Sequence, residues 1–293
     1  MHIPVLLEEV LQYLALAPGK FVIDGTVNGG GHARAILSQI GSNGKVLGID
    51  WDESIVRKWE VGSEKNENIT AIHGNYADLP AILKERNLPK ADALLLDLGF
   101  SSGQLDLSGR GFSFERDEPL LMTYDKGSEP VAVLLRKTPE RELMSIIRDY
   151  GEERYAVQIA RAIVVREKQA PIMTSKELAE TISAAVPKSY ERGRIHPATR
   201  TFQALRIYAN GELENLRRVI LELPQIVHAG GRVVIISFHS LEDRIVKTMF
   251  REMVAHGALE ILTKKPIVAS EKEIAANPRS RSAKLRAAQL TQN

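Results

Sequence analysis

Residues 21–32 decide the fold, and they read Phe21-Val22-Ile23-Asp24-Gly25-Thr26-Val27-Asn28-Gly29-Gly30-Gly31-His32. The first four form a short apolar run that ends in an acid, as buried strands of α/β proteins often do. The glycines that follow let the backbone turn sharply and approach a ligand where a Cβ atom would collide. His32 opens an amphipathic stretch that reaches Ile40. The segment therefore predicts a strand, a loop and a helix at the ligand-binding edge of an α/β sheet.

Similar apolar runs recur along the chain on the C-terminal side of this segment. They occupy residues 45–50, 69–73, 91–97 and 230–238. Near-continuous apolar character is what a parallel strand requires when both faces of its sheet are covered. The stretches 32–40 and 53–59 have the pattern of crossover helices, so strands and helices alternate. The predicted fold class is α/β, with a doubly wound, Rossmann-like sheet.

The alternation of strands and helices stops at about Leu105. From there to Tyr190 no strand is convincing, whereas helical patterns occur at 152–166 and 178–186. Thr174 and Glu177 have the spacing of a capping box ahead of the second of these helices, and Pro187 ends it. A structureless loop of this length is unlikely in a compact domain. We therefore expect an inserted helical domain at 105–206, with 1–104 and 207–293 forming one discontinuous sheet domain.

Two acids indicate the class of ligand. Asp50 ends the second predicted strand, twenty positions after Gly30, where an acid meets the ribose hydroxyls of a nucleotide. Asp24 precedes a Gly-x-x-x-Gly-Gly-Gly loop, in place of the Gly-x-Gly-x-x-Gly of dehydrogenases, and its charge would repel a pyrophosphate. A ligand with an ammonium and a sulfonium group suits this acid, which favours S-adenosylmethionine over a nicotinamide cofactor. For the loop alone, a glycine-rich turn without a ligand remains an alternative.

Asp97 ends the fourth predicted strand and is followed by Leu98-Gly99-Phe100. Aminomethyltransferases often carry Asp, Asn or Ser, two prolines and an aromatic residue at this place. There the polar side chain accepts hydrogen bonds from the amino group, and the aromatic ring stacks on the base. This sequence keeps the acid and the aromatic residue but neither proline. Asp97 and Phe100 are therefore candidate catalytic residues, and a strand-ending acid beside a core phenylalanine is the alternative.

Motifs from one end of the chain to the other resemble the MraW/RsmH family. They lie at residues 2–6, 24–32, 97–102, 110–114, 201–207, 237–244 and 277–286. That family methylates the exocyclic amino nitrogen of a cytidine in the decoding region of bacterial 16S rRNA. The resemblance implies a 16S rRNA (cytosine-N(4))-methyltransferase with a class I methyltransferase sheet that binds S-adenosylmethionine, and an inserted domain that binds the substrate. It also implies cofactor contacts by Gly30, Gly31, His32, Asp50, Tyr76, Asp97 and Gln104.

The chain departs from the family pattern at three places. Phe100 stands where valine is usual, and Gly103 stands where proline is usual. The stretch Leu121-Met122-Thr123-Tyr124 lacks an acid and an arginine that the family carries there. This change keeps one alternative open, a catalytically weakened RNA-binding protein that retains a methyltransferase fold.

The net charge of +2 hides two basic segments. Residues 188–206 carry a net charge of +4, and residues 264–286 carry +5. Clustered cations in a nearly neutral protein form a face that attracts anions such as RNA phosphates. The expected RNA contacts are Arg194, Arg200, Arg279, Arg281 and Lys284, and Asn277-Pro278 suggests that the second segment extends across the surface. Two ordinary solvated surface segments are the alternative.

The remaining features of the sequence concern the cellular compartment, metal sites and partners of the protein. Cysteine is absent, no secretory signal or apolar run of membrane length is present, and a cytoplasmic protein is expected. The seven histidines are scattered, so no metal site is predicted. His239 is expected to play a structural or base-contacting role, with Ser240 capping the following helix. The partner is expected to be 16S rRNA or the small ribosomal subunit, and a homodimer is left open.

Overall fold

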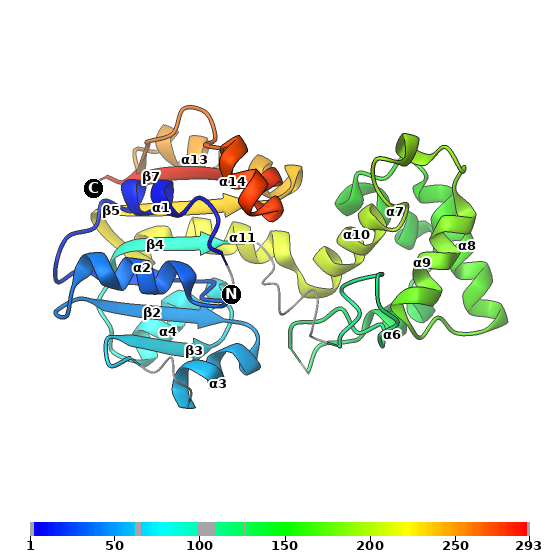
Figure 1. Ribbon diagram of the computed structural model, residues 1–293, viewed down its shortest axis with the longest axis horizontal. Coiled ribbons are helices and arrows are strands. Elements are labelled where there is room, and N and C mark those ends of the chain that lie inside the picture. Colours follow the sequence, from blue (N-terminus) through cyan, green and yellow to red (C-terminus); the bar gives the residue numbers. More distant parts are fainter. Residues whose placement is uncertain (1–2, 62–65, 99–108, 126, 292–293) are drawn as a thin grey trace. The chain divides into compact units, whose positions relative to one another are not determined.

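The computed structural model describes residues 3–61, 66–98, 109–125 and 127–291. The chain forms two compact units (Figure 1). The sheet unit comprises Met1–Ser101 and Leu213–Asn293, and the helical unit comprises Ser102–Glu212. The sequence analysis placed the corresponding boundaries after residues 104 and 206.

The sheet unit contains a seven-stranded sheet with the order β3-β2-β1-β4-β5-β7-β6. The strands are β1 (Phe21–Asp24), β2 (Lys45–Asp50), β3 (Ile69–His73), β4 (Ala91–Asp97), β5 (Val227–Ser237), β6 (Leu259–Ile261) and β7 (Lys284–Leu290). The first five pair in parallel, while β7 lies antiparallel between β5 and β6. The fold is thus the doubly wound, Rossmann-like α/β sheet that was predicted. The first four predicted strands coincide with β1–β4, and the fifth begins three residues before the predicted start.

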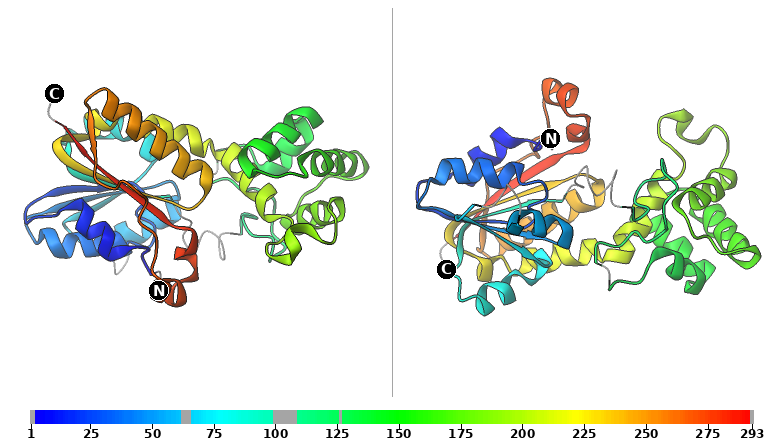
Figure 2. Two further views of the ribbon diagram at one scale, coloured as in Figure 1. Left: turned by 90° about the horizontal axis from the view of Figure 1, so that it is seen from above. Right: turned by 60° about the horizontal axis from the view of Figure 1, so that its bottom comes forward.

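Helices cover both faces of this sheet, which explains why its parallel strands are apolar throughout. On one face, α1 (Leu7–Leu14), α2 (Gly31–Ile40) and α3 (Glu53–Val61) share a core with inward residues of the strands, such as Val22, Leu95 and Val234. The other helices are α4 (Leu79–Glu85), α11 (Glu212–Leu221), α12 (Leu223–Ile226), α13 (Ser240–Ala255) and α14 (Glu271–Ala276). Figure 2 shows α1 and α2 on one side of the sheet and α13 on the other.

The strand β7 corrects the expectation for the second basic segment. Residues 284–290 do not extend across the surface, because they form a strand inside the sheet. Leu285 and Ala287 are fully buried and join the same core as α1 and α2. Pro278 does end the preceding helix: α14 stops at Ala276, and a short 3-10 helix, η3 (Pro278–Ser282), follows. Pairing with β5 and β6 and the burial of Leu285 and Ala287 therefore decide the place of this segment, despite its charge.

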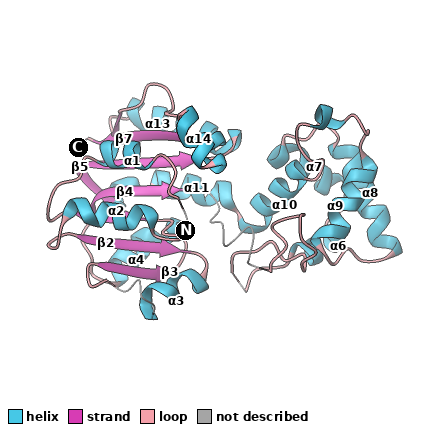
Figure 3. Cartoon of the chain, in the orientation of Figure 1, coloured by secondary structure: helices cyan, strands magenta, loops and turns pink. Residues whose placement is uncertain are grey.

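The helical unit contains helices and loops but no strand in its described residues (Figure 3). Its helices are α6 (Val131–Lys137), α7 (Glu140–Gly151), α8 (Ala156–Gln169), α9 (Ser175–Ala185) and α10 (Thr199–Asn210), with a 3-10 turn, η2, at Tyr190–Gly193. The predicted capping box is present, since the N–H of Glu177 donates to the side chain of Thr174 and the Glu177 carboxylate accepts from the backbone of Thr174. The helix predicted at 152–166 begins only at Ala156, because Glu152 ends α7 in a left-handed conformation (φ 49°).

The atypical stretch 121–124 is an ordered part of the helical unit. Met122 is buried in a left-handed conformation, and its carbonyl accepts a hydrogen bond from Nδ2 of Asn210 at 2.8 Å. The N–H of Tyr124 donates to Oδ1 of the same asparagine at 3.0 Å, and the Tyr124 ring stacks on Phe112. The changed residues thus supply packing and backbone hydrogen bonds. No described helix in the chain is both long enough and apolar enough to span a membrane.

Candidate functional site

Three acids meet at the carboxyl edge of the parallel strands. Asp24, Asp50 and Asp97 end β1, β2 and β4, which are neighbours in the sheet. Each acid is at most 5% exposed. Ligands of open α/β sheets bind beyond this edge, where the strand order reverses. Here the reversal lies at β1, between β2 and β4, which places the three carboxylates at the expected position for a ligand.

The loop between β1 and α2 is fixed to both neighbouring strands. The N–H of Gly25 donates to the carbonyl of Leu95 on β4 at 2.9 Å, and the N–H of Val27 donates to the carbonyl of Ile49 on β2 at 2.8 Å. Oγ1 of Thr26 accepts from the N–H of Asp97 at 2.7 Å. The loop therefore has a defined path over the strand ends before any ligand binds, which is the preorganisation a binding site needs.

The carboxylate of Asp50 is oriented by two backbone groups. The N–H of Asn28 donates to Oδ2 at 2.9 Å, and the N–H of Asp52 donates to Oδ1 at 2.8 Å. Burial nevertheless raises the pKa of Asp50 to about 7, because the two hydrogen bonds only partly offset the loss of water. Each oxygen keeps a lone pair that can accept a further hydrogen bond. This acid can therefore hold the two hydroxyls of a ribose.

Asp24 and His32 lie beside the third acid. Burial raises the pKa of Asp24 to about 6, the nearby His32 lowers it, and the charge of Asp97 raises it further. Nε2 of the buried His32 lies 3.0 Å from the carbonyl of Val5, so Nε2 carries a proton and donates to it. Nδ1 lies 3.6 Å from Oδ2 of Asp97, which is an electrostatic contact beyond normal hydrogen-bond length. Desolvated acids of this kind favour a ligand that brings positive charge.

The glycines of the loop are required by packing as well as by any ligand. A Cβ atom on Gly30, whose φ is +71°, would lie 1.8 Å from the ring of Trp59. A Cβ atom on Gly31 would lie 3.1 Å from Pro4. A sharp turn and the approach of a ligand were the predicted reasons for these glycines, whereas their Cβ directions are in fact occupied by Trp59 and Pro4. Their backbones remain at the start of α2, on the carboxyl edge of the sheet.

Of the remaining candidate cofactor residues, the structure describes Tyr76 but not Gln104. Tyr76 opens the short 3-10 helix η1 (Tyr76–Asp78) after β3, and it is half-buried at the same edge of the sheet. A Cβ atom on Gly25 would lie 3.2 Å from Cβ of Tyr76, so this tyrosine borders the loop. Phe100 and Gln104 lie outside the described residues. Five candidate cofactor residues, from the start of α2, the end of β2 and the start of η1, thus lie with Asp97 at one edge of the sheet.

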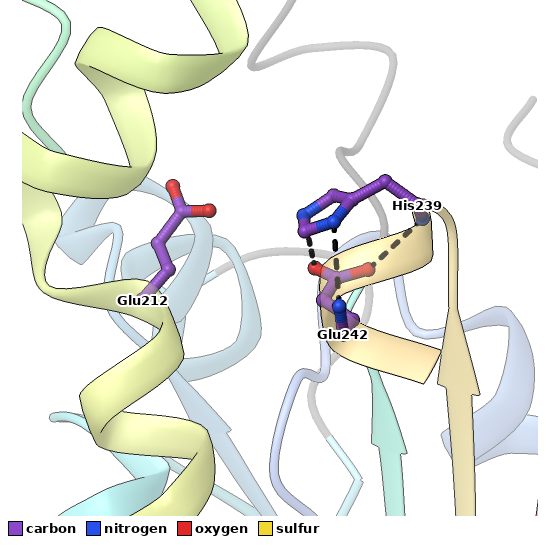
Figure 4. A group of neighbouring side chains, drawn as sticks. All are labelled: Glu212, His239 and Glu242. Atoms are coloured by element: carbon purple, nitrogen blue, oxygen red, sulfur yellow. Dashed lines mark hydrogen bonds and ion pairs between the residues drawn. The ribbon is translucent and has the colours of Figure 1, made fainter. Parts of the chain in front are cut away.

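His239 caps α13, which corrects the expectation that Ser240 would do so. Nδ1 of His239 accepts from the N–H of Glu242, and Oε2 of Glu242 accepts from the N–H groups of His239 and Phe238 (Figure 4). Nε2 of His239 lies 3.1 Å from Oε1 of Glu242. The reciprocal pair makes a capping box in which histidine takes the usual place of serine or threonine. Glu212, also drawn in Figure 4, binds Arg206 within the helical unit.

The candidate RNA contacts differ in how free they are. Arg194 and Arg281 are exposed, whereas Arg279 is half-buried in η3. In the helical unit, Arg200 donates to the carbonyl of Glu152 at 3.5 Å. Lys284 is bound to Asp243 at 3.5 Å, so its charge is already matched inside the sheet unit. Of the five, Lys284 is therefore the least suited to hold a phosphate.

A basic hollow between α13, β6 and β7 was missed by the sequence analysis. It is shallow, is open to solvent, and is lined by Lys247, Phe250, Arg251, Ile261, Thr263, Lys264 and Arg286. Nε of the buried Arg286 donates to Asp243 at 2.7 Å, and this arginine and Lys284 help to hold the pKa of Asp243 below its ordinary range. The spacing of Lys247 and Arg251 on one helix face was visible in the sequence. Their meeting with a cation on β7 was not, because it depends on the pairing of distant strands.

Comparison with known proteins identifies the family. The sequence model of the MraW methylase family matches residues 1–291. The chain belongs to this family. It is 46% identical over 306 residues to a ribosomal RNA small subunit methyltransferase H of Syntrophotalea carbinolica, covering 98% of this chain and 96% of the relative. A relative of the same name from Kosmotoga olearia is 46% identical over 292 residues, with coverage of 98% and 97%.

A solved structure was also compared with this member of the MraW methylase family. Aeropyrum pernix fibrillarin, determined with bound S-adenosyl-L-methionine, is 13% identical and gives a TM-score of 0.40. The alignment covers 96% of this chain and 73% of fibrillarin.

Proposed function

We propose that this protein transfers a methyl group from S-adenosylmethionine to the exocyclic amino nitrogen of a cytidine in the decoding region of 16S rRNA. The observation that carries the proposal is the group of buried acids Asp24, Asp50 and Asp97 at the sheet edge, in a chain of the MraW methylase family. Relatives named as ribosomal RNA small subunit methyltransferases support the substrate. The protein is expected to act in the cytoplasm, on the small subunit or its 16S rRNA.

The chemistry of the site fits this cofactor. When bound, the sulfonium of S-adenosylmethionine supplies an electrophilic methyl group. Asp50 accepts hydrogen bonds from the ribose hydroxyls, and the carboxylate of Asp24 matches the positive charge of the methionine part. The backbone at Gly30, Gly31 and His32 would border the same ligand, as would Tyr76, which lies beside Gly25 of the loop. The positive charge of the ligand favours the carboxylate form of Asp24 and so opposes the effect of burial, which raises its pKa to about 6.

Asp97 is assigned to the amino group that receives the methyl. Its backbone is held by Thr26, so its carboxylate can accept a hydrogen bond from the amino group at a fixed place. Such positioning aligns the nitrogen lone pair with the methyl group and supplies much of the rate acceleration. Phe100, three residues later, is proposed to stack on the base. The helical unit, Ser102–Glu212, is proposed to bind the RNA around the target.

A methyl-transfer assay tests this function directly. Purified protein is incubated with labelled S-adenosylmethionine and either unmodified 16S rRNA or small subunits, and the nucleosides are then separated by mass spectrometry. We expect one methyl group on the amino nitrogen of a single cytidine. If the protein binds cofactor and RNA but methylates neither substrate, the non-catalytic RNA-binding alternative is correct. Gel filtration of the same sample would report whether the protein is a monomer or a homodimer.

The raised pKa of Asp50 predicts a pH dependence with two opposite signs. Because its folded pKa of about 7 exceeds the ordinary 3.8, Asp50 stabilises the free protein at low pH, and this contribution is lost as pH rises through 7. Cofactor binding needs the carboxylate, so affinity should rise roughly three- to tenfold from pH 6 to pH 8. Calorimetry at four pH values measures the affinity, and thermal melts measure the stability of the free protein. In Asp50→Asn, cofactor affinity and the stability of the free protein should both change less with pH. The remaining change should come from Asp24, whose pKa is about 6. Equal slopes in both proteins would contradict the assignment.

RNA phosphate contacts are predicted at η3. Changing Arg279, Arg281 and Lys284 together to alanine should weaken RNA binding and flatten its salt dependence. Because Lys284 is paired with Asp243, we expect the loss of about two phosphate contacts, each worth roughly 0.7–0.9 in the logarithmic salt slope. Filter binding at several salt concentrations measures this slope. The control changes Lys84, Arg86 and Lys90, three exposed cations before the amino end of β4. An equal loss in both triple variants would show only a general charge effect.

A further inference from the structure

Three aromatic rings in the helical unit form a column whose exposure increases outward. Phe202 on α10 is buried, Phe114 is half-buried, and His196 is exposed. Phe114 meets Phe202 edge to face, with ring centroids 5.4 Å apart at 86°. Phe114 and His196 are stacked, with centroids 4.3 Å apart at 17°. The column therefore ends in a flat ring at the surface, supported from below by the core of the unit.

The outer ring is held in one orientation. Nδ1 of His196 accepts from the N–H of Ala198 at 3.1 Å, in the turn that precedes α10. The neutral ring consequently carries its proton on Nε2. The carbonyl of His196 accepts from the N–H of Thr199 at 3.1 Å, which fixes the backbone of the same turn. A ring that is already stacked and hydrogen-bonded loses little conformational entropy when another ring is placed on it.

We propose that the exposed face of His196, backed by Phe114, is a stacking platform for an unpaired base of the RNA substrate. The inference rests on the proposed function. An exocyclic amino group in a base pair is not accessible to a methyl donor, so the target cytidine must be unpaired and its neighbours lose a stacking partner. An aromatic ring replaces that partner for any base, because every base has a π-face.

The stacking contribution of the platform is distinct from the phosphate contact expected of the neighbouring Arg194. Arg116 and Arg194 are exposed two positions from Phe114 and His196, respectively. Two exposed acids, Glu115 and Asp117, flank Arg116 and offset its charge. The contribution of the platform should therefore be largely independent of salt, unlike that of phosphate contacts.

Two substitutions of His196 separate stacking from its structural role. His196→Tyr keeps an aromatic face but loses the acceptor for the Ala198 N–H, whereas His196→Asn keeps an acceptor but loses the ring. The control is Tyr208→Ala, which removes another exposed ring of α10 that is tilted against Tyr150 and bonded to Glu142. Affinity for a 16S rRNA fragment containing the decoding region is measured by filter binding at several salt concentrations. Thermal unfolding followed by far-UV circular dichroism reports whether the helical unit of each variant is folded.

We expect His196→Asn to weaken RNA binding about tenfold with an unchanged salt slope, and His196→Tyr to bind within about threefold of the unmodified protein. Phe114→Ala should resemble the Asn variant, and Tyr208→Ala should bind normally. The platform is refuted if His196→Asn binds normally, if Tyr is no better than Asn, or if Tyr208→Ala loses as much. Because these outcomes concern binding, they are distinct from a failure of the proposed function, in which the unmodified protein methylates neither substrate.

Discussion

Replacing Asp50 with alanine is expected to weaken the binding of S-adenosylmethionine at least tenfold. The carboxylate is already oriented by the N–H groups of Asn28 and Asp52, so the proposed contact with the ribose hydroxyls requires little reorganisation of this side chain. Hydrogen bonds to a charged group contribute about 1.5–3 kcal/mol each, and two ribose hydroxyls would lose their acceptor. Calorimetry of the purified variant measures the loss.

A matched control exists at the opposite edge of the same sheet. Asp92 also accepts a backbone hydrogen bond, from the N–H of Phe21 at 2.8 Å, and it binds Lys20. Asp92→Ala should destabilise the sheet unit without changing cofactor affinity. Unchanged affinity in Asp50→Ala would remove the ribose assignment, and equal losses in the two variants would indicate a general weakening of the sheet.

Removing the helical unit should abolish methylation of RNA while sparing the cofactor site. The variant lacks Ser102–Glu212 and joins Ser101 to Leu213 through a flexible linker. Asp24, Asp50 and Asp97 all belong to the sheet unit, so cofactor affinity should stay within a few-fold of the intact protein. Methyl transfer should fall by at least about 100-fold, because orientation of the substrate supplies much of the rate.

Two measurements on this shortened chain test whether the helical unit is needed for methylation of RNA but not for cofactor binding. Calorimetry with S-adenosylmethionine reports whether the sheet unit folds by itself, and the methyl-transfer assay reports the role of the removed unit. Normal methylation would show that Ser102–Glu212 has no part in binding the substrate. As a control, Asp50→Ala in the full chain should lose cofactor binding and still bind RNA. This is the reverse of the result expected for the deletion, which should keep cofactor binding and lose its action on RNA.

The parts of the fold that were predictable from the sequence are those with a strong local signal. Strands β1–β4 are apolar runs bounded by Asp or Gly, and a parallel strand covered on both faces needs such a run. The capping box at Thr174 and Glu177 is equally local. In contrast, β7 reads Lys284-Leu285-Arg286-Ala287-Ala288-Gln289-Leu290, which has little intrinsic preference for a strand. Its pairing with β5 and β6 is non-local, so the sequence window alone could not assign it.

The candidate site likewise contains features that local sequence predicts and features that depend on non-local contacts. The acids at the strand ends were predictable because the carboxyl edge of a parallel sheet follows from the strands themselves. The reason for Gly30 was not, since it depends on Trp59, which lies on another helix. The cap formed by His239 was missed because histidine is an unusual first residue of a capping box, although Glu242 three positions later was a usable signal. The basic hollow needed the tertiary pairing of β7.

The place of β7 within the sheet has a consequence for the order in which the chain folds during synthesis. In the sheet order, β6 neighbours only β7, so β6 cannot join the sheet until residues 284–290 have left the ribosome. The N-terminal segment also cannot complete its contacts until residues 273–277 are available. The N–H of Leu6 donates to Glu273 at 2.7 Å, and the carbonyl of Ile3 accepts from Asn277 at 3.2 Å. Such late, long-range contacts slow folding. Until β7 has been synthesised, β5 is therefore an open edge of the sheet, where another strand can pair wrongly.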